Sequence, residues 1–200
     1  MLCLTRPTPA AWVDSALKNL DAVLVDHAHC ELKAAQNALS LVPRALSRAM
    51  ADELLALADE EMRHVRRVLD ELDRRGLRLG TPPPDPYAAE LRTLANRSRP
   101  GGRDARQALL DRLLVAALIE ARSCERFRLL ADGLAGAGQA ALAAFYEELF
   151  EAEARHYRVF TELAAEAAGD RALARQRLGQ LSLAEGEVCA KLGAAAAIHG

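Results

Sequence analysis

The amino-acid sequence predicts an all-α fold, a bundle of long helices, and three observations lead to this prediction. Of the 200 residues 51% are apolar but only 4% are aromatic, so Ala, Leu and Val must form most of the core. This composition favours close-packed helices over a β-sandwich, which is rich in β-branched and aromatic residues. Apolar residues recur with a helical period over four long segments, and Pro and Gly gather in the links between them.

The first half of the chain predicts two long helices. A short flanking helix precedes the first of them, which spans about residues 20–42 and ends at Pro43 because proline cannot continue a helix. The second spans about 47–75, and Gly76 follows it as a natural helix-terminating residue.

The middle of the chain predicts a long crossover over about residues 76–103. Four prolines lie between residues 80 and 86, and this stretch cannot form a helix interior. A short helical piece fits residues 87–96, and the rest of the crossover is expected to be loop.

The second half predicts two more long helices, at about 104–132 and 139–168, with a loop at 133–138 between them. A last helical segment spans about 171–192, with a break expected near Ser182. Short links within each helix pair and one long crossover between the second and third helices are typical of ferritin-like four-helix bundles. We therefore expect residues 1–200 to form a single ferritin-like domain.

Charge, cysteines and hydropathy predict a cytoplasmic protein that does not enter a membrane. The formal net charge is −2, and the four cysteines lie far apart without a CxxC pair. Such cysteines are typical of reduced thiols, not of disulfides or a zinc site. The first residues do not form a secretory signal, and no apolar run reaches the 18 residues that a membrane span needs.

Two Glu-x-x-His motifs indicate a metal site, Glu61–His64 and Glu153–His156. They lie on the second and fourth predicted helices, and each continues as Glu-x-Arg-His-x-Arg. Residues three apart share one helix face, so the carboxylate and the imidazole can reach the same ion. Di-iron and di-manganese bundles take one such motif from each of two helices and one more Glu from each of the other two.

The first and third long helices each offer an acid for this site. Glu31 falls in the apolar stripe of the first helix, where an unpaired carboxylate would be costly. On the third helix Glu120 falls in a parallel stripe, whereas Glu125 matches Glu31 through a shared Cys-Glu pair. We favour Glu120 for its face and spacing and keep Glu125 as the alternative. If Glu125 is not a ligand, we expect it to pair with an arginine such as Arg122 or Arg128.

Aromatic residues gather beside the motif of the fourth helix, among them Tyr146, Phe150 and Tyr157. Core packing explains most clusters of this kind, but these three would also suit the wall of a pocket for an apolar substrate. His27 and His29 belong to no motif. We interpret them as satisfied or exposed histidines, with contacts to a ligand or substrate as the alternative.

Three stretches around the candidate ligands match a known pattern: DHAHCELKAA at 26–35, IEARSCERF at 119–127 and EARHY at 153–157. Together they resemble the MiaE family, and the likeness extends over nearly the whole chain. The resemblance implies a ferritin-like non-haem di-iron monooxygenase that hydroxylates the isopentenyl group of 2-methylthio-N6-isopentenyladenosine at position 37 of tRNA. Two Fe ions and O₂ are its implied cofactors. Because the sequence has no rubredoxin-like cysteine quartet and no flavin fingerprint, an external reductase is expected to supply electrons.

Other functions are compatible with the same ligand set. A rubrerythrin-like peroxidase would lack its usual Cys₄ iron domain here, and iron storage would need a cage and many irons per chain. A quinone-biosynthesis hydroxylase would need a membrane-facing apolar helix, which the sequence does not offer. From a different class, a metal-free helical interaction module would bind no iron.

The net charge of −2 conceals a basic segment in the crossover. Residues 92–106 hold five arginines against Asp104 alone. Clustered arginines are the electrostatic footprint of phosphate contact. We therefore expect Arg97, Arg99 and Arg103 to contact tRNA, with a solvated loop as the alternative. The sequence does not indicate an oligomeric state.

Overall fold

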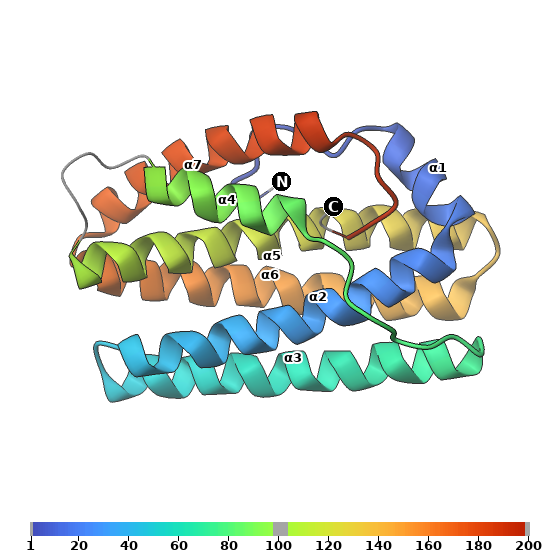
Figure 1. Ribbon diagram of the computed structural model, residues 1–200, viewed down its shortest axis with the longest axis horizontal. Helices are drawn as coiled ribbons and strands as arrows, with labels where there is room; N and C mark the ends of the chain where they lie inside the picture. The colour runs from blue at the N-terminus through green and yellow to red at the C-terminus, as the bar shows by residue number, and fades with distance from the viewer. Residues whose placement is uncertain (1, 98–103, 199–200) are drawn as a thin grey trace.

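Long helices lie side by side in the computed structural model, which describes residues 2–97 and 104–198. Four of the helices in this part form a bundle (Figure 1): α2 Leu20–Leu41, α3 Arg48–Arg74, α5 Ala105–Gly136 and α6 Ala140–Ala168. Three more pack against it: α1 Ala11–Lys18, α4 Pro86–Arg97 and α7 Arg171–Leu192. The described ranges contain no strand, so the all-α prediction is confirmed.

Short links join the helices within each pair. After α2, the 3-10 turn η1 (Val42–Arg44) carries Pro43, and the Ser47 hydroxyl then accepts a hydrogen bond of 3.1 Å from the Met50 backbone N–H to begin α3. Between α5 and α6, Gly138 has a φ of +75°, which glycine adopts without steric cost.

The crossover from α3 to α5 places α4 over the bundle, where it contacts α5 and α7 (Figure 1). Asp85 caps α4 by accepting from the Ala88 backbone N–H at 3.0 Å. It also accepts from Lys33 Nζ of α2 at 3.0 Å. At the other side, the Tyr87 hydroxyl donates to Glu185 of α7 at 2.8 Å. These polar contacts hold α4 beside the space between α2 and α5.

Two features of the helices differ from those expected from the sequence, the end of α5 and an expected break within α7. α5 continues beyond residue 132 to Gly136, because Gly133 serves close packing instead of ending the helix. A Cβ at Gly133 would lie 2.9 Å from Val13 Cγ1 of α1. α7 has no break near Ser182, since the N-terminal segment binds there: the Thr5 hydroxyl donates to the Ser182 carbonyl at 3.0 Å, and the Ser182 hydroxyl donates to the Cys3 carbonyl.

Two apolar clusters fill the bundle, and a polar layer separates them. One cluster includes Leu57 and Leu118, and the other includes Val68 and Phe127. Along each of the four bundle helices, the acids and histidines singled out above lie between a residue of one cluster and a residue of the other. Within the described ranges, none of the helices combines the length and apolar character needed to cross a bilayer.

Candidate metal centre

The four bundle helices bring six candidate ligands together in the polar layer. α2 supplies one residue, α5 one, and α3 and α6 a pair each: Glu31, Glu120, Glu61 with His64, and Glu153 with His156. All six are buried, none more than 5% exposed. Each pair is one helical turn apart, which places its carboxylate and imidazole on the same inward face.

The donor atoms form two overlapping groups, and within each group they lie within 4.8 Å of one another. The first consists of Glu31, Glu61, His64 and Glu153, and the second of Glu61, Glu120, Glu153 and His156. Glu61 and Glu153 belong to both. Carboxylates that belong to both groups could each contact two neighbouring ions.

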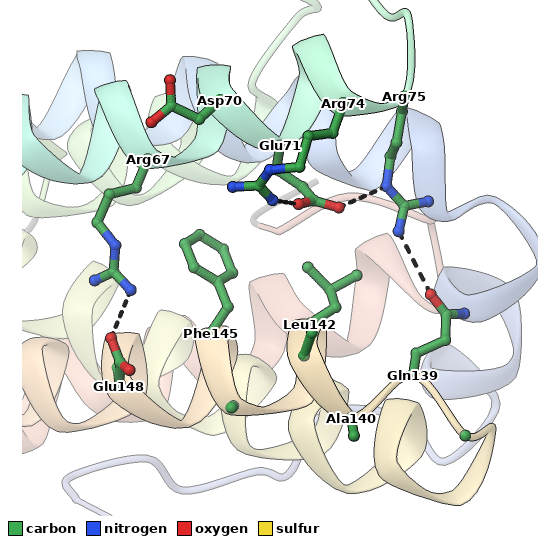
Figure 2. A pocket seen from close by; sticks show the side chains of 13 residues that line it. Arg67, Asp70, Glu71, Arg74, Arg75, Gln139, Ala140, Leu142, Phe145 and Glu148 are labelled. Atoms are coloured by element: carbon green, nitrogen blue, oxygen red, sulfur yellow. Dashed lines mark hydrogen bonds and ion pairs between the residues drawn. The ribbon is translucent and has the colours of Figure 1, made fainter.

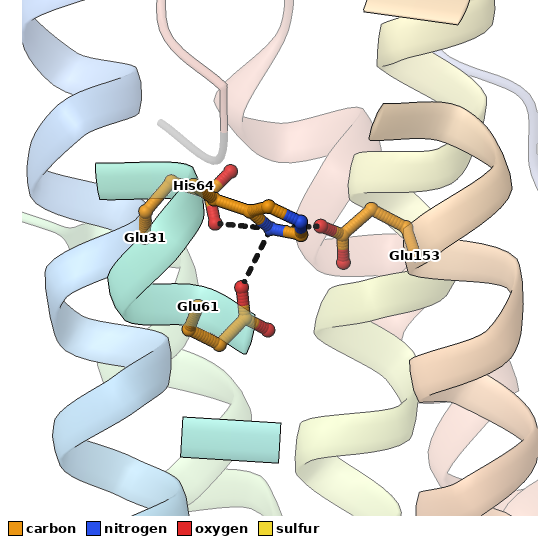
Figure 3. Close-up of side chains that lie close together, drawn as sticks. All are labelled: Glu31, Glu61, His64 and Glu153. Atoms are coloured by element: carbon orange, nitrogen blue, oxygen red, sulfur yellow. Dashed lines mark hydrogen bonds and ion pairs between the residues drawn. The ribbon is translucent and has the colours of Figure 1, made fainter. Parts of the chain in front are cut away.

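His64 lies at the centre of the first group, facing carboxylates from α2, α3 and α6 (Figure 3). Its Nδ1 atom is 3.1 Å from Glu61 Oε2, 3.5 Å from Glu31 Oε2 and 3.9 Å from Glu153 Oε1. One imidazole nitrogen therefore faces three acids at once, which is more than its single N–H can serve.

In the second group, buried donor atoms lack hydrogen bonds. His156 Nδ1 is 2.8 Å from Glu61 Oε1 and 3.7 Å from Glu153 Oε2, but neither approach has hydrogen-bond geometry. Glu153 Oε2 and both ring nitrogens of His156 have no hydrogen-bond partner among the described residues. Buried polar atoms are normally paired, so these atoms fit a bound cation. Carboxylate oxygens with imidazole nitrogens are a donor set that suits iron or manganese.

Electrostatics also favour added positive charge at this centre. Burial, with the charge of Glu31, raises the pKa of Glu61 to about 7. Burial and the neighbouring Glu153 raise the pKa of Glu120 well above its ordinary value. Burial lowers the pKa of His64, but hydrogen bonds with Glu31 and Glu61 outweigh it and raise that pKa to about 10. Without metal cations, the negative charge of the cluster is therefore reduced by protons that these groups retain. Bound metal cations would neutralise the same charge.

Two acids that are not candidate ligands differ in their relation to the centre: Glu60 contacts the candidate ligand His156, whereas Glu125 does not belong to either donor group. Glu60 Oε2 is 3.2 Å from His156 Nε2, and Arg155 donates to Glu60 Oε1 at 2.7 Å. Glu125 lies outside both groups. It accepts from the Thr8 hydroxyl at 2.6 Å and pairs with Arg122, the arginine expected for it if it is not a ligand.

His27 contacts a candidate ligand, in agreement with the alternative interpretation of this histidine. Its Nε2 atom is 2.6 Å from Glu31 Oε1, and its Nδ1 is 3.3 Å from the Tyr146 hydroxyl. The spacing of His27 and Glu31 could have indicated this contact, because residues four apart share a helix face. His29 instead bonds the Leu79 carbonyl at 3.0 Å.

Of the three aromatics that would suit a pocket wall, Tyr146 contacts His27, which in turn contacts the candidate ligand Glu31. Phe150 is half-buried under the guanidinium of Arg128, 5.8 Å from its ring centroid, and Tyr157 lies beside Cys3. None of the three lines either of the cavities described next.

A cavity of about 430 Å³ between α2, α4 and α5 reaches the centre at Glu120. Apolar side chains such as Ala34, Val115, Ala116 and Ile119 form part of its wall. No motif in the sequence indicated this cavity. A larger cleft of about 860 Å³ between α3 and α6 is lined by none of the six candidate ligands. The smaller cavity is therefore the one that bears on the chemistry of the centre.

The crossover arginines expected to contact tRNA fall at or beyond the limit of the described residues. Arg97 is the last residue of α4, and its side chain, like Arg99 and Arg103, lies outside the described residues.

Comparison with known proteins agrees with the resemblance noted in the sequence. A family model described as tRNA-(MS[2]IO[6]A)-hydroxylase (MiaE) matches residues 1–200. The tRNA 2-(methylsulfanyl)-N(6)-isopentenyladenosine(37) hydroxylase of Pseudomonas putida is 40% identical over 159 residues, which cover 79% of this chain and 73% of that protein. The Salmonella typhimurium protein of the same name is 28% identical over 221 residues, covering 86% of this chain and 78% of its own.

A solved structure extends the comparison to the fold. "Protein 43 with aldehyde deformylating oxygenase activity from Synechococcus" matches with a TM-score of 0.84 and 34% identity, covering 100% of this chain and 96% of that one. Both the predicted ferritin-like fold and the predicted family are thereby confirmed. This chain belongs to the MiaE family.

Proposed function

We propose that this protein is an O₂-dependent di-iron monooxygenase that hydroxylates the isopentenyl group of 2-methylthio-N6-isopentenyladenosine at position 37 of tRNA. The observation that carries the proposal is the pair of overlapping donor groups with shared Glu61 and Glu153. The names of the relatives support the substrate. A tRNA substrate also supports a cytoplasmic location.

The six side chains have distinct roles in this proposal. Glu61 and Glu153, which belong to both donor groups, would help to hold both ions. Glu31 with His64 would hold one of them, and Glu120 with His156 the other. Four ionised carboxylates balance the charge of two divalent cations, so the buried centre becomes neutral when both ions bind. When bound, the iron pair supplies the reduction of O₂ and the insertion of one of its oxygen atoms into a C–H bond.

The reaction needs more than O₂ and substrate. Hydroxylation of R–H with O₂ to give R–OH and water consumes two electrons and two protons. We assign the electrons to a separate reductase, in keeping with the absence of a flavin fingerprint and a cysteine quartet from the sequence.

The cavity at Glu120 would receive the isopentenyl group. Ala34, Ala116 and Ile119 give its inner wall an apolar character that matches the prenyl chain. An apolar wall also excludes water from the carbon that reacts. The side chain of Glu120 is both a candidate ligand and part of this wall, so the substrate carbon can lie next to the metal centre.

The test combines metal analysis with product analysis. The protein is loaded anaerobically with Fe(II), its iron per chain is measured, and prenylated tRNA, O₂ and a reductant are added. We expect two irons and a nucleoside that has gained one oxygen atom. Two irons without product from tRNA or the free nucleoside would overturn the substrate assignment. Many irons per chain would indicate storage, and no bound iron would indicate an interaction module.

A further inference from the structure

Two arginine-bearing clefts of this molecule differ in how their charges are paired. In the cleft between α3 and α6 (Figure 2), Arg67 pairs with Glu148 at 2.5 Å, and Arg75 pairs with Glu71 at 2.8 Å. Arg74 also pairs with Glu71. The arginines of this cleft are thus already neutralised by carboxylates of the same chain.

The cavity that reaches Glu120 has a different set of arginines around it. Arg112 donates to the Ser40 hydroxyl at 2.5 Å, and Arg44 donates to the Ser40 carbonyl at 2.6 Å, so the two guanidinium groups meet at one residue. Arg92 lines the same cavity as Arg112 and donates to the Ala88 carbonyl at 3.1 Å. Among the described residues, the partners of these three arginines are all neutral.

The two aspartates of the cavity wall pair with other cations, and its third acid, Glu120, belongs to the candidate metal centre. Asp85 accepts from Lys33 at 3.0 Å, and Asp111 accepts from Arg177 at 2.7 Å. Burial lowers the pKa of Arg112, and the charges of Arg44 and Arg92 lower it further. Three like charges therefore gather at one place, and within the described ranges none of them pairs with a carboxylate, which is unfavourable until an anion binds.

We propose that Arg44, Arg92 and Arg112 form a binding site for the phosphates of RNA at the mouth of this cavity. Arg44 and Arg92 are exposed and Arg112 is half-buried, so the charges extend from the surface toward the cavity. The identity of the nucleotide inside rests on the proposed function. A base that leaves the stack of an RNA loop can enter a protein pocket while its flanking phosphates stay outside. The three guanidinium groups hold those phosphates and so direct the modified base toward Glu120.

Binding of an anticodon stem-loop RNA that lacks the modified base tests this site without requiring catalysis. The variant is R44Q/R92Q, in which two exposed cations are removed and Ser40 is left intact. The matched control is R67Q/R74Q, which removes two arginines from the paired cleft. We expect the first variant to bind about 10-fold more weakly, with a plot of log Kd against log salt concentration less steep by about 1 to 2. The control should stay within about 2-fold of the wild type.

Iron content and far-UV circular dichroism verify that both variants are folded. Unchanged affinity and salt dependence in R44Q/R92Q, or equal losses in the two variants, would overturn the proposal. The single variant R112K, which keeps the charge, should bind more tightly than R112Q, and equal binding by the two would also contradict it. If the wild type binds RNA in this pattern but hydroxylates neither tRNA nor nucleoside, the proposed function fails and this inference stands. If R44Q/R92Q hydroxylates tRNA with wild-type kcat/KM, this inference fails and the function stands.

Discussion

Glu31 and Glu120 occupy corresponding positions on α2 and α5, but their surroundings differ. Four residues before Glu31 the chain has His27, which lies 2.6 Å from the Glu31 carboxylate with Tyr146 behind it. Four residues before Glu120 it has Ala116, which lines the cavity. An imidazole on one helix closes one end of the centre, whereas a methyl group on the other leaves space. One residue per helix thus distinguishes a closed end from an accessible one.

The electrostatic properties of the two ends follow from this difference. Burial raises the pKa of Glu31, but hydrogen bonds from His27 and His64 outweigh it and hold that pKa well below its ordinary value. At Glu120, burial acts together with the carboxylate of Glu153, and the pKa rises well above the ordinary value. The closed end has its charge compensated by the protein. The open end needs a cation for the same purpose.

The largest expected effect comes from removing the acid of the open end. Glu120→Ala should lose iron and reduce hydroxylation more than about 100-fold, because one coordination shell loses its only carboxylate that is not shared. Glu125→Ala is the matched control five residues away, and it should retain two irons while losing about 1–3 kcal/mol of stability, since Arg122 loses a partner. The iron content per chain of the two variants shows whether Glu120 or Glu125 is the ligand from α5. Loss of iron in Glu125→Ala with retention in Glu120→Ala would make Glu125 the ligand.

Filling the accessible end should separate metal binding from turnover. Ala116→Leu places a larger side chain in the cavity wall, so we expect two irons per chain but a fall in kcat/KM for prenylated tRNA of about 10- to 100-fold. Ala116→Ser, which adds little volume, is the control and should stay near the wild type. Wild-type turnover by Ala116→Leu would mean that the substrate enters elsewhere.

Opening the closed end should weaken iron binding. His27→Ala removes the hydrogen bond to Glu31, and loss of such a support for a metal ligand typically costs about 10- to 100-fold in affinity. His29→Ala is the matched control, because His29 bonds a backbone carbonyl and none of the candidate ligands. Competition with an iron chelator measures both affinities. Equal weakening in the two variants would show that His27 has no particular role at the centre.

The smallest effect concerns the tyrosine behind His27. Tyr146→Phe keeps the buried ring and removes only the hydroxyl that lies 3.3 Å from His27 Nδ1. We expect a loss of about 0.5–1.5 kcal/mol in the free energy of unfolding. Urea denaturation of the iron-free protein measures it, and a variant as stable as the wild type would indicate that this hydrogen bond contributes nothing.

The helical period of the sequence accounts for much of the fold and for the burial of the candidate ligands. Residues three and four apart share a face, so Glu61 with His64 and Glu153 with His156 had to point the same way as the neighbouring apolar residues. The stripe that contains Glu120 distinguished it from Glu125, which lies on the face that contacts Thr8. These inferences need only local geometry.

Features that depend on distant segments could not be predicted in the same way. The expected break near Ser182 is absent because Cys3 and Thr5, far away in the sequence, bond to that residue. Gly133 remains helical because α1 packs closely on it. The cavity depends on where α4 lies over α2 and α5, and the Pro-rich crossover does not reveal that position. Local sequence determines faces, whereas the space between helices depends on the tertiary fold.

The most direct test of the central claim is a single turnover with ¹⁸O₂. The protein is loaded with two Fe(II) per chain without oxygen, mixed with prenylated tRNA, and exposed to ¹⁸O₂ with a two-electron reductant. The expected product is a nucleoside with one ¹⁸O in the isopentenyl group, formed by the wild type and absent with Glu120→Ala. Oxidation of both irons without labelled product, or a hydroxyl group that carries oxygen from water, would contradict the claim that this centre is a monooxygenase.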